Sequence, residues 1–270
     1  MTYLTTLTKY LTLSSGENIF YREAGLNTSP TILLLHGLPS SSHQYRNLIP
    51  ILSPHYHIIA PDLPAFGFTS VPENYTYTFD NIANSIDTFL TCLRSTAYIL
   101  ALPVKHPGKI QAIISQNGNA YDEGLGTFWD PIKTLWASGN ATSARDPLGP
   151  IVEIAATKSQ YFGGTVDASA IASESYSLDQ YLLDRPGHKE IQLDILYDYG
   201  TNPPLYPSWQ KWMRDSQVPV LAVWGKNDPI FFYNSPNSEV HLLDGSHFIV
   251  ESHVAEIGAL MISFLKRHGI

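Results

Sequence analysis

Two polar residues in the C-terminal part of the sequence can carry hydrolytic chemistry, and each follows an apolar, strand-like run. Asp228 comes after the run 218–224, and His247 comes after the run 240–243. A carboxylate that hydrogen-bonds to an imidazole holds it in one tautomer and stabilises its protonated form, so the imidazole can act as a general base. An acid followed by a histidine, each after a strand, is the chain order of a nucleophile, acid and histidine triad. We therefore predict that Asp228 and His247 form a catalytic pair.

Each residue also has a purely structural interpretation. A lone histidine in a Gly-Ser-His-Phe turn is usually a surface or capping residue, and Asp-Pro after a strand is usually a turn. Their order along the chain, together with a His-Gly-Leu-Pro segment at 36–39 after another apolar run, favours the catalytic interpretation. The presence of Asp228 and His247 does not by itself make the chain an active enzyme.

The elements that must position this pair alternate between strands and helices, which predicts an α/β fold with a mostly parallel sheet flanked by helices. An N-terminal hairpin is expected from 4–13 and 18–21. Further strands are expected at 32–35, 57–60, 97–102, 110–115, 218–224 and 240–243. Helices are expected at 43–52, at 82–93 with Thr78 or Asp80 as the N-cap, and at 253–267. Residues 121–214 lack strand periodicity and predict a helical lid, so the domains are core 1–120, lid 121–214 and core 215–270.

Two connections in this pattern are too short. Parallel neighbours in a sheet need a crossover of about a dozen residues or more, usually with a helix. Only residues 103–108 separate the strand ending at Leu102 from Lys109, and two of them are prolines, which forbid a continuous helix. The fourteen residues between Trp224 and Glu239 are also few, because they must hold the loop of Asp228 as well as return to the sheet. Either these strands are not parallel neighbours, or a crossover helix and the turn before it have been lost.

Five segments together resemble the haloalkane dehalogenase and epoxide hydrolase branch of the α/β-hydrolases. They read His-Gly-Leu-Pro-Ser-Ser-Ser-His at 36–43, Asp-Leu-Pro-Ala-Phe-Gly-Phe-Thr at 62–69, Ile-Ser-Gln-Asn-Gly-Asn-Ala-Tyr at 114–121, Trp-Gly-Lys-Asn-Asp-Pro-Ile-Phe at 224–231 and Gly-Ser-His-Phe at 245–248. Ala65 stands where that branch usually has glycine. The resemblance implies an α/β-hydrolase fold with a lid, abbreviated at two crossovers.

The same resemblance assigns roles to individual residues. His247 would be the base, Asp228 the acid, and the backbone N–H of Leu38, in a loop shaped by His36 and Gly37, would supply half of an oxyanion or halide site. Tyr161 is a candidate lid residue, as are Tyr181, Tyr197 and Tyr199, because lid tyrosines activate epoxides in related enzymes. Packing remains the default role for each of them among sixteen tyrosines.

The nucleophile of this branch has no counterpart in the sequence. It is an aspartate on a sharp Asp-Tyr-Gly or Asp-Trp-Gly turn, whereas here Tyr98-Ile99-Leu100 continues into Ala101-Leu102-Pro103. Cys92, Ser95 and Thr96 are the candidate substitutes, and we favour none of them; Cys92 falls in an apolar helical stretch, where we expect it to be core. We therefore assign no nucleophile.

Composition excludes several other classes of function. A net charge of −8 without any run of Lys or Arg argues against nucleic acids and anionic membranes as partners. A single cysteine excludes internal disulfides and a cysteine-ligated metal, and no segment has the length of a membrane span or the pattern of a signal peptide. We expect a cytoplasmic protein that needs no metal or cofactor and takes a small-molecule substrate. Oligomeric state is not predicted.

Three functions remain open at this stage. The first is a cofactor-independent hydrolase of a small apolar electrophile, whose short form has lost in-frame blocks and is impaired. The second uses the His-Asp pair as a general base for a non-hydrolytic step, such as elimination or cyclisation in secondary metabolism. The third is a non-catalytic, ligand-binding protein with the same fold.

Overall fold

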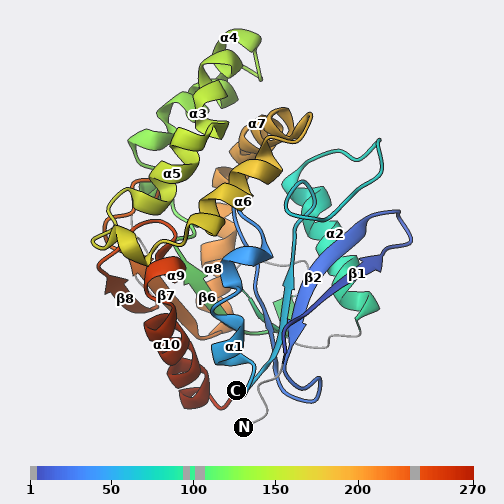
Figure 1. Cartoon of the computed structure of the whole chain (residues 1–270), viewed down its shortest axis with the longest axis vertical. Coiled ribbons are helices and arrows are strands. Elements are labelled where there is room, and N and C mark those ends of the chain that lie inside the picture. The colour runs from blue at the N-terminus through green and yellow to red at the C-terminus, as the bar shows by residue number, and fades with distance from the viewer. Residues whose placement is uncertain (1–4, 94–97, 101–106, 232–237) are drawn as a thin grey trace.

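One sheet forms the centre of the protein (Figure 1). The computed structural model describes residues 5–93, 98–100, 107–231 and 238–270. Within these ranges eight strands pair in the order β1-β2-β4-β3-β5-β6-β7-β8. Their bounds are β1 Leu7–Thr12, β2 Asn18–Ala24, β3 Thr31–Leu33, β4 His57–Pro61, β5 Tyr98–Leu100, β6 Ile110–Gln116, β7 Val220–Gly225 and β8 Glu239–Leu243.

The N-terminal hairpin and the parallel core of the sheet are both present. β1 pairs antiparallel with β2, which pairs antiparallel with β4, and every later pair in the sheet is parallel. The carboxyl ends of β3 to β8 therefore meet at one edge of the sheet, where ligands bind in open α/β sheets.

The strands on either side of the first short connection are parallel neighbours, with Tyr98 of β5 opposite Ile110 of β6. Residues 101–109 must join them, and such a segment is too short for the usual crossover helix. β7 and β8 are also parallel neighbours, joined by residues 226–238. The structure thus decides between the two alternatives: the strand pairs are kept, and both crossovers are abbreviated.

Helices cover the two faces of the sheet. One face packs against α1 (Ile49–Leu52), α9 (Ile249–Ser252) and α10 (Val254–Arg267) in a core that includes Leu52, Ile257 and Phe264. The other face packs against α2 (Phe79–Cys92) through Ile82, Ile86, Phe89 and Leu90, with Trp212 and Met213 of α8 (Tyr206–Ser216) alongside. The helical spacing of the apolar residues in α2 explains why it presents one buried stripe.

Two local expectations need correction. The helix expected over 43–52 is interrupted: a 3-10 turn covers Ser42–Tyr45, and α1 begins only at Ile49. Pro50 lies in the first turn of α1, where its missing N–H is tolerated, whereas a continuous helix would need that donor. Cys92, expected in the core, is exposed at the last turn of α2. Thr78 is the N-cap of α2, and its hydroxyl accepts a hydrogen bond from the Asn81 N–H.

The region expected to be a lid is helical (Figure 1). It contains α3 (Asp130–Ala137), α4 (Thr142–Arg145), α5 (Ile154–Phe162), α6 (Ser173–Leu183) and α7 (His188–Asp198), which gather at the top of the view. Their own core includes Trp129, Ile132, Leu135 and Leu196. α8 begins inside this region and joins the two cores: Tyr206 and Trp209 pack with the other helices, whereas Trp212 and Met213 pack against the sheet. No helix in the described part of the chain is both long and apolar enough to span a bilayer.

Candidate active site

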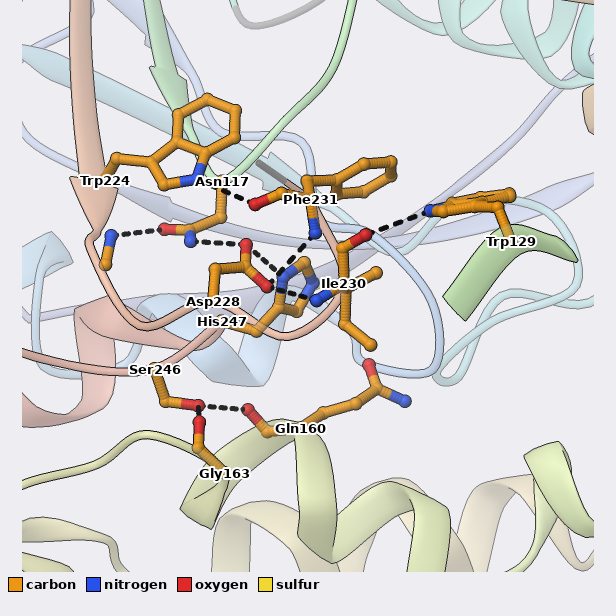
Figure 2. Close-up of polar contacts among 11 residues, drawn as sticks. Asn117, Trp129, Gln160, Gly163, Trp224, Asp228, Ile230, Phe231, Ser246 and His247 are labelled. Atoms are coloured by element: carbon orange, nitrogen blue, oxygen red, sulfur yellow. Dashed lines mark hydrogen bonds and ion pairs between the residues drawn. The ribbon is translucent and has the colours of Figure 1, made fainter. Parts of the chain in front are cut away.

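Asp228 and His247 meet at the carboxyl edge of the sheet (Figure 2). Asp228 follows β7, His247 follows β8, and the two strands are parallel neighbours, so both side chains arrive at the same edge. Nδ1 of His247 lies 3.0 Å from Oδ2 of Asp228. With Nδ1 engaged, Nε2 is the imidazole nitrogen that can exchange a proton with a ligand.

Three further donors fix the Asp228 carboxylate, which is buried. Oδ2 also accepts a hydrogen bond from Nδ2 of Asn117 at 2.7 Å. Oδ1 accepts from the backbone N–H groups of Ile230 at 2.7 Å and Phe231 at 3.2 Å. Because every donor comes from a fixed backbone or a buried side chain, the carboxylate is held in one orientation towards the imidazole.

Asn117 is a site residue that the sequence analysis did not single out. It directly follows β6 with a φ of +50°, in the left-handed region that asparagine tolerates better than most residues. Its Nδ2 donates to Asp228, while its Oδ1 accepts from the Gly225 N–H at 3.3 Å. Asn117 therefore ties the end of β6 to the end of β7. The available signal was an Asn-Gly pair directly after a buried strand.

Both ring nitrogens of His36 bind the backbone of nearby loops, so His36 has a structural role in shaping the turn at Gly37 and Leu38. Its Nε2 accepts a hydrogen bond from the Leu63 N–H at 3.0 Å, so Nδ1 carries the proton and donates to the Gly37 carbonyl at 3.0 Å. Burial lowers the pKa of His36 below its ordinary value, in keeping with this neutral tautomer. Both ring nitrogens are thus used to shape the turn that carries Gly37 and Leu38.

The neighbouring loop 62–69 contains Ala65, which stands where related enzymes usually have glycine. Asp62 accepts from the Ser42 N–H at 2.7 Å and from the Phe68 N–H at 2.8 Å, which fastens this loop to the 3-10 turn that begins at Ser42. Ala65 has a φ of +83°, a conformation that costs an alanine about 1–2 kcal/mol and a glycine little. A left-handed turn is therefore kept here without the usual glycine.

A cavity of about 980 Å³ joins these parts. His247, Gly37, Leu38 and Asn117 all line it, so the imidazole and the loop 36–39 face one space. Aromatic side chains form much of the nearby wall, and Nε1 of Trp129 donates to the Ile230 carbonyl at 3.0 Å. A pocket of this size lies near the upper end of the usual range for small-molecule sites.

The structure does not bring Tyr161 to this cavity. Its hydroxyl donates to Oδ2 of Asp179 at 2.5 Å, and its ring stacks on Phe248 with centroids 4.3 Å apart. Burial raises the pKa of Asp179 to about 7. Tyr199 is the lid tyrosine that lines the cavity, with its hydroxyl 3.0 Å from that of Tyr206.

The position where the nucleophile would follow β5 lies outside the described residues, which resume at Pro107. The expectation that no nucleophile faces His247 from residues 100–106 therefore stays a prediction. Among the described residues, no three His, Cys, Asp or Glu side chains gather in a way that could hold a metal ion.

Comparison with known proteins places these features in a family. A model of the alpha/beta hydrolase fold matches residues 30–256. An uncharacterized hydrolase of Saccharomyces cerevisiae is 40% identical over 278 aligned residues, which cover 95% of this chain and 96% of the yeast protein. Because that alignment is longer than the 270 residues of the whole chain, part of the yeast protein has no counterpart here.

More distant relatives carry specific names. Haloalkane dehalogenase 2 of Mycobacterium tuberculosis is 25% identical over 92% of each chain. The solved structure of the epoxide hydrolase CorEH is 16% identical, covers 97% of this chain and 99% of its own, and superimposes with a TM-score of 0.73. The fold class predicted from the sequence is confirmed, and the chain belongs to the α/β-hydrolase family.

Proposed function

We propose that the chain is a cofactor-independent hydrolase of an uncharged, apolar electrophile, of the epoxide hydrolase and haloalkane dehalogenase type, and that its covalent route is impaired in this form. The observation that carries the proposal is that His247, held by Asp228, lines a large cavity together with His36, Gly37 and Leu38. The names of the dehalogenase and epoxide hydrolase relatives support the reaction class.

The retained residues would serve the water-activating half of the reaction. Nε2 of His247 takes a proton from water, and the Asp228 carboxylate stabilises the imidazolium that forms. The backbone N–H of Leu38 donates to the oxygen or halide on which negative charge develops. The lining of Trp129, Phe231 and Phe248 excludes bulk water and accepts an apolar group.

Impairment follows from the sequence between β5 and β6. Residues 98–109 contain no aspartate, and their length leaves no room for the usual turn and crossover helix. Without an attacking carboxylate no covalent ester forms, and loss of such a group costs several orders of magnitude in rate. The unmatched part of the yeast relative is consistent with a block of sequence that this chain lacks.

A second candidate is a general-base enzyme that needs no nucleophile. The observation in its favour is that Asp228 orients His247 at the wall of the cavity. Such a site could promote elimination or cyclisation, or activate water for direct attack. A non-catalytic protein would bind a ligand in the same cavity, and Asp228 and His247 would take no part in any reaction.

One set of assays separates these candidates. Purified chain, its His247→Ala variant and a variant with an inserted Asp-Tyr-Gly turn and helix after Leu100 are compared on epoxides, haloalkanes and activated esters. We expect the first two to be equally slow and the third to be active. A His241→Ala variant is the matched control, because His241 lies on β8 and pairs with Glu239 away from the cavity. Turnover by the unmodified chain that depends on His247 would contradict impairment and favour the general-base enzyme.

A further inference from the structure

One short segment of the helical region lies against both loops that carry the catalytic pair. This segment, residues 160–164, contains the end of α5 and the turn after it. The residues on either side of His247 both contact it, and so does the residue directly before Asp228. Three contacts from two loops therefore converge on five consecutive residues.

Ser246 connects the loop of His247 to the end of α5 (Figure 2). Its side chain is only 2% exposed, and its hydroxyl oxygen lies 2.9 Å from the Gln160 carbonyl oxygen and 2.5 Å from that of Gly163. A hydroxyl has one proton to donate, so the two carbonyl groups share it in a three-centre hydrogen bond. Because Ser246 directly precedes His247, this bond restrains the backbone that carries the imidazole.

The end of α5 also depends on this hydroxyl. The last four carbonyl groups of a helix have no partner within it. In α5, three of these four accept hydrogen bonds from residues 163–165. The fourth carbonyl, that of the buried Gln160, accepts from Ser246, which is 86 residues away in the sequence. Loss of the hydroxyl would therefore leave a buried acceptor unpaired.

The loop of Asp228 meets the same segment at a close approach of two backbones. Nδ2 of Asn227 donates to the Gly164 carbonyl at 2.9 Å, and the Asn227 N–H donates to the Gly245 carbonyl in the loop of His247 at 3.2 Å. Gly164 has a φ of +84°, and a Cβ added there would lie 2.4 Å from the Asn227 carbonyl oxygen. Glycine is therefore required for this contact.

An aromatic contact holds the other side of the His247 loop. The ring of Phe248 stacks on that of Tyr161 with centroids 4.3 Å apart and planes 17° apart. The Tyr161 hydroxyl donates to Asp179 of α6, so a second helix fixes this ring. Tyr161 thus contacts the residue next to the base, although it does not face the cavity.

We propose that residues 160–164 position the catalytic pair and that Ser246 is the positioning residue for His247. The segment keeps the imidazole in the orientation in which Nδ1 donates to Asp228, so a displacement of α5 would release the base. This assignment rests on the proposed function for the reaction that the pair serves. It adds that α5 is a fixed support of the site rather than part of a movable lid.

The NMR signals of the His247 imidazole test this assignment without any need for turnover. In the ¹⁵N-labelled chain, these are the imidazole signals that disappear in His247→Ala. We expect a proton on Nδ1 that exchanges slowly with water, because it is bonded to Asp228. In Ser246→Ala this proton should exchange about tenfold faster, the factor expected when one buried hydrogen bond is lost and the loop opens more often.

Ser175→Ala is the matched control for this variant. The Ser175 hydroxyl is also buried and also joins the helical region to the core, because it donates to Glu251 of α9 at 3.0 Å. It has no contact with residues 245–248. The exchange rate of the His247 proton in Ser175→Ala should equal that of the wild type.

Gly164→Ala is the second variant, for use if thermal unfolding shows that Ser246→Ala is misfolded. The added Cβ would push the segment away from Asn227, and we again expect exchange about tenfold faster. Gly139→Ala is its matched control: Gly139 has a φ of +66°, so alanine costs a similar backbone strain, but an added Cβ meets no atom within 4 Å.

The outcomes separate this inference from the proposed function. A wild-type Nδ1 proton that exchanges freely, an unchanged rate in the folded test variant, or an equal acceleration in its control overturns the inference. Acceleration confined to the test variant supports it, whether or not any epoxide, haloalkane or ester is turned over. Failure of the proposed function would show separately, as inactivity of the variant with the inserted Asp-Tyr-Gly turn.

Discussion

Replacing Asp228 by asparagine should destabilise the protein as well as disturb its site. The carboxylate accepts four hydrogen bonds, two on Oδ2 from His247 and Asn117 and two on Oδ1 from the backbone N–H groups of Ile230 and Phe231. An amide has one acceptor oxygen and one donor nitrogen. Whichever way the amide is turned, its NH₂ group faces two donors.

The size of the effect follows from the donors left without an acceptor. A buried donor that loses its partner costs about 1–3 kcal/mol, so two cost about 4 kcal/mol. With an unfolding entropy of about 2 cal/mol/K per residue, a chain of this length should lose about 2 °C in Tm per kcal/mol, or about 8 °C in all. Asp244→Asn is the matched control, because Asp244 is exposed and should change Tm by no more than about 1 °C.

Thermal unfolding followed by circular dichroism, with urea titration at one temperature, measures both variants. We expect Asp228→Asn to show the lower Tm in every buffer in which the wild type unfolds reversibly. If Asp228→Asn unfolds within about 1 °C of Asp244→Asn, the four hydrogen bonds do not hold the carboxylate as described, and the structural basis for pairing Asp228 with His247 fails with them.

Further predictions concern Asp179 in α6 and the loop 62–69. Burial raises the pKa of Asp179 to about 7, so the folded state binds this proton more tightly than the unfolded state, and the free energy of unfolding should fall as pH rises from about 4 to about 7. Asp179→Asn should flatten that part of the profile in urea titrations, and an unchanged profile would contradict the assignment. Gly67→Ala should cost about 2–4 kcal/mol, because φ is +54° and the new Cβ would lie 1.9 Å from Oδ2 of Asp62. Ala65→Gly, in the same loop, should instead raise stability by up to about 1 kcal/mol by relieving a φ of +83°; a lower Tm would refute that reading.

Much of the fold could be predicted because it is encoded locally. The runs 32–35 and 218–224 are apolar throughout, and the run 57–60 is apolar after His57, as is typical of strands buried on both faces; the structure has strands at each of them. The spacing of Ile82, Ile86 and Leu90 predicted the buried stripe of α2. The short connections between β5 and β6 and between β7 and β8 could also be predicted, because their length follows from counting residues in the sequence.

The candidate site could be predicted only in part. The order of Asp228 and His247 along the chain predicted their meeting, because successive parallel strands end at the same edge of the sheet. Asn117 could not be found in this way: its partner is 111 residues away, and nothing in the local sequence says which carboxylate its amide will reach. The direction of Tyr161 depends likewise on Asp179 and Phe248, which belong to other segments.

By itself, then, the sequence determined the class of fold, the meeting of Asp228 and His247 at one edge of the sheet, and the lack of an aspartate turn after β5. Only the tertiary structure decided that β5 and β6 stay paired, that His247 and the loop at Gly37 and Leu38 face one cavity, and that Tyr161 points away from it towards Asp179. The physical reason is that the spacing of apolar residues specifies which side of a helix or strand is buried. It does not specify which other helix or strand that side packs against. That choice depends on contacts between segments distant in the chain, and these contacts exist only once the sheet has formed.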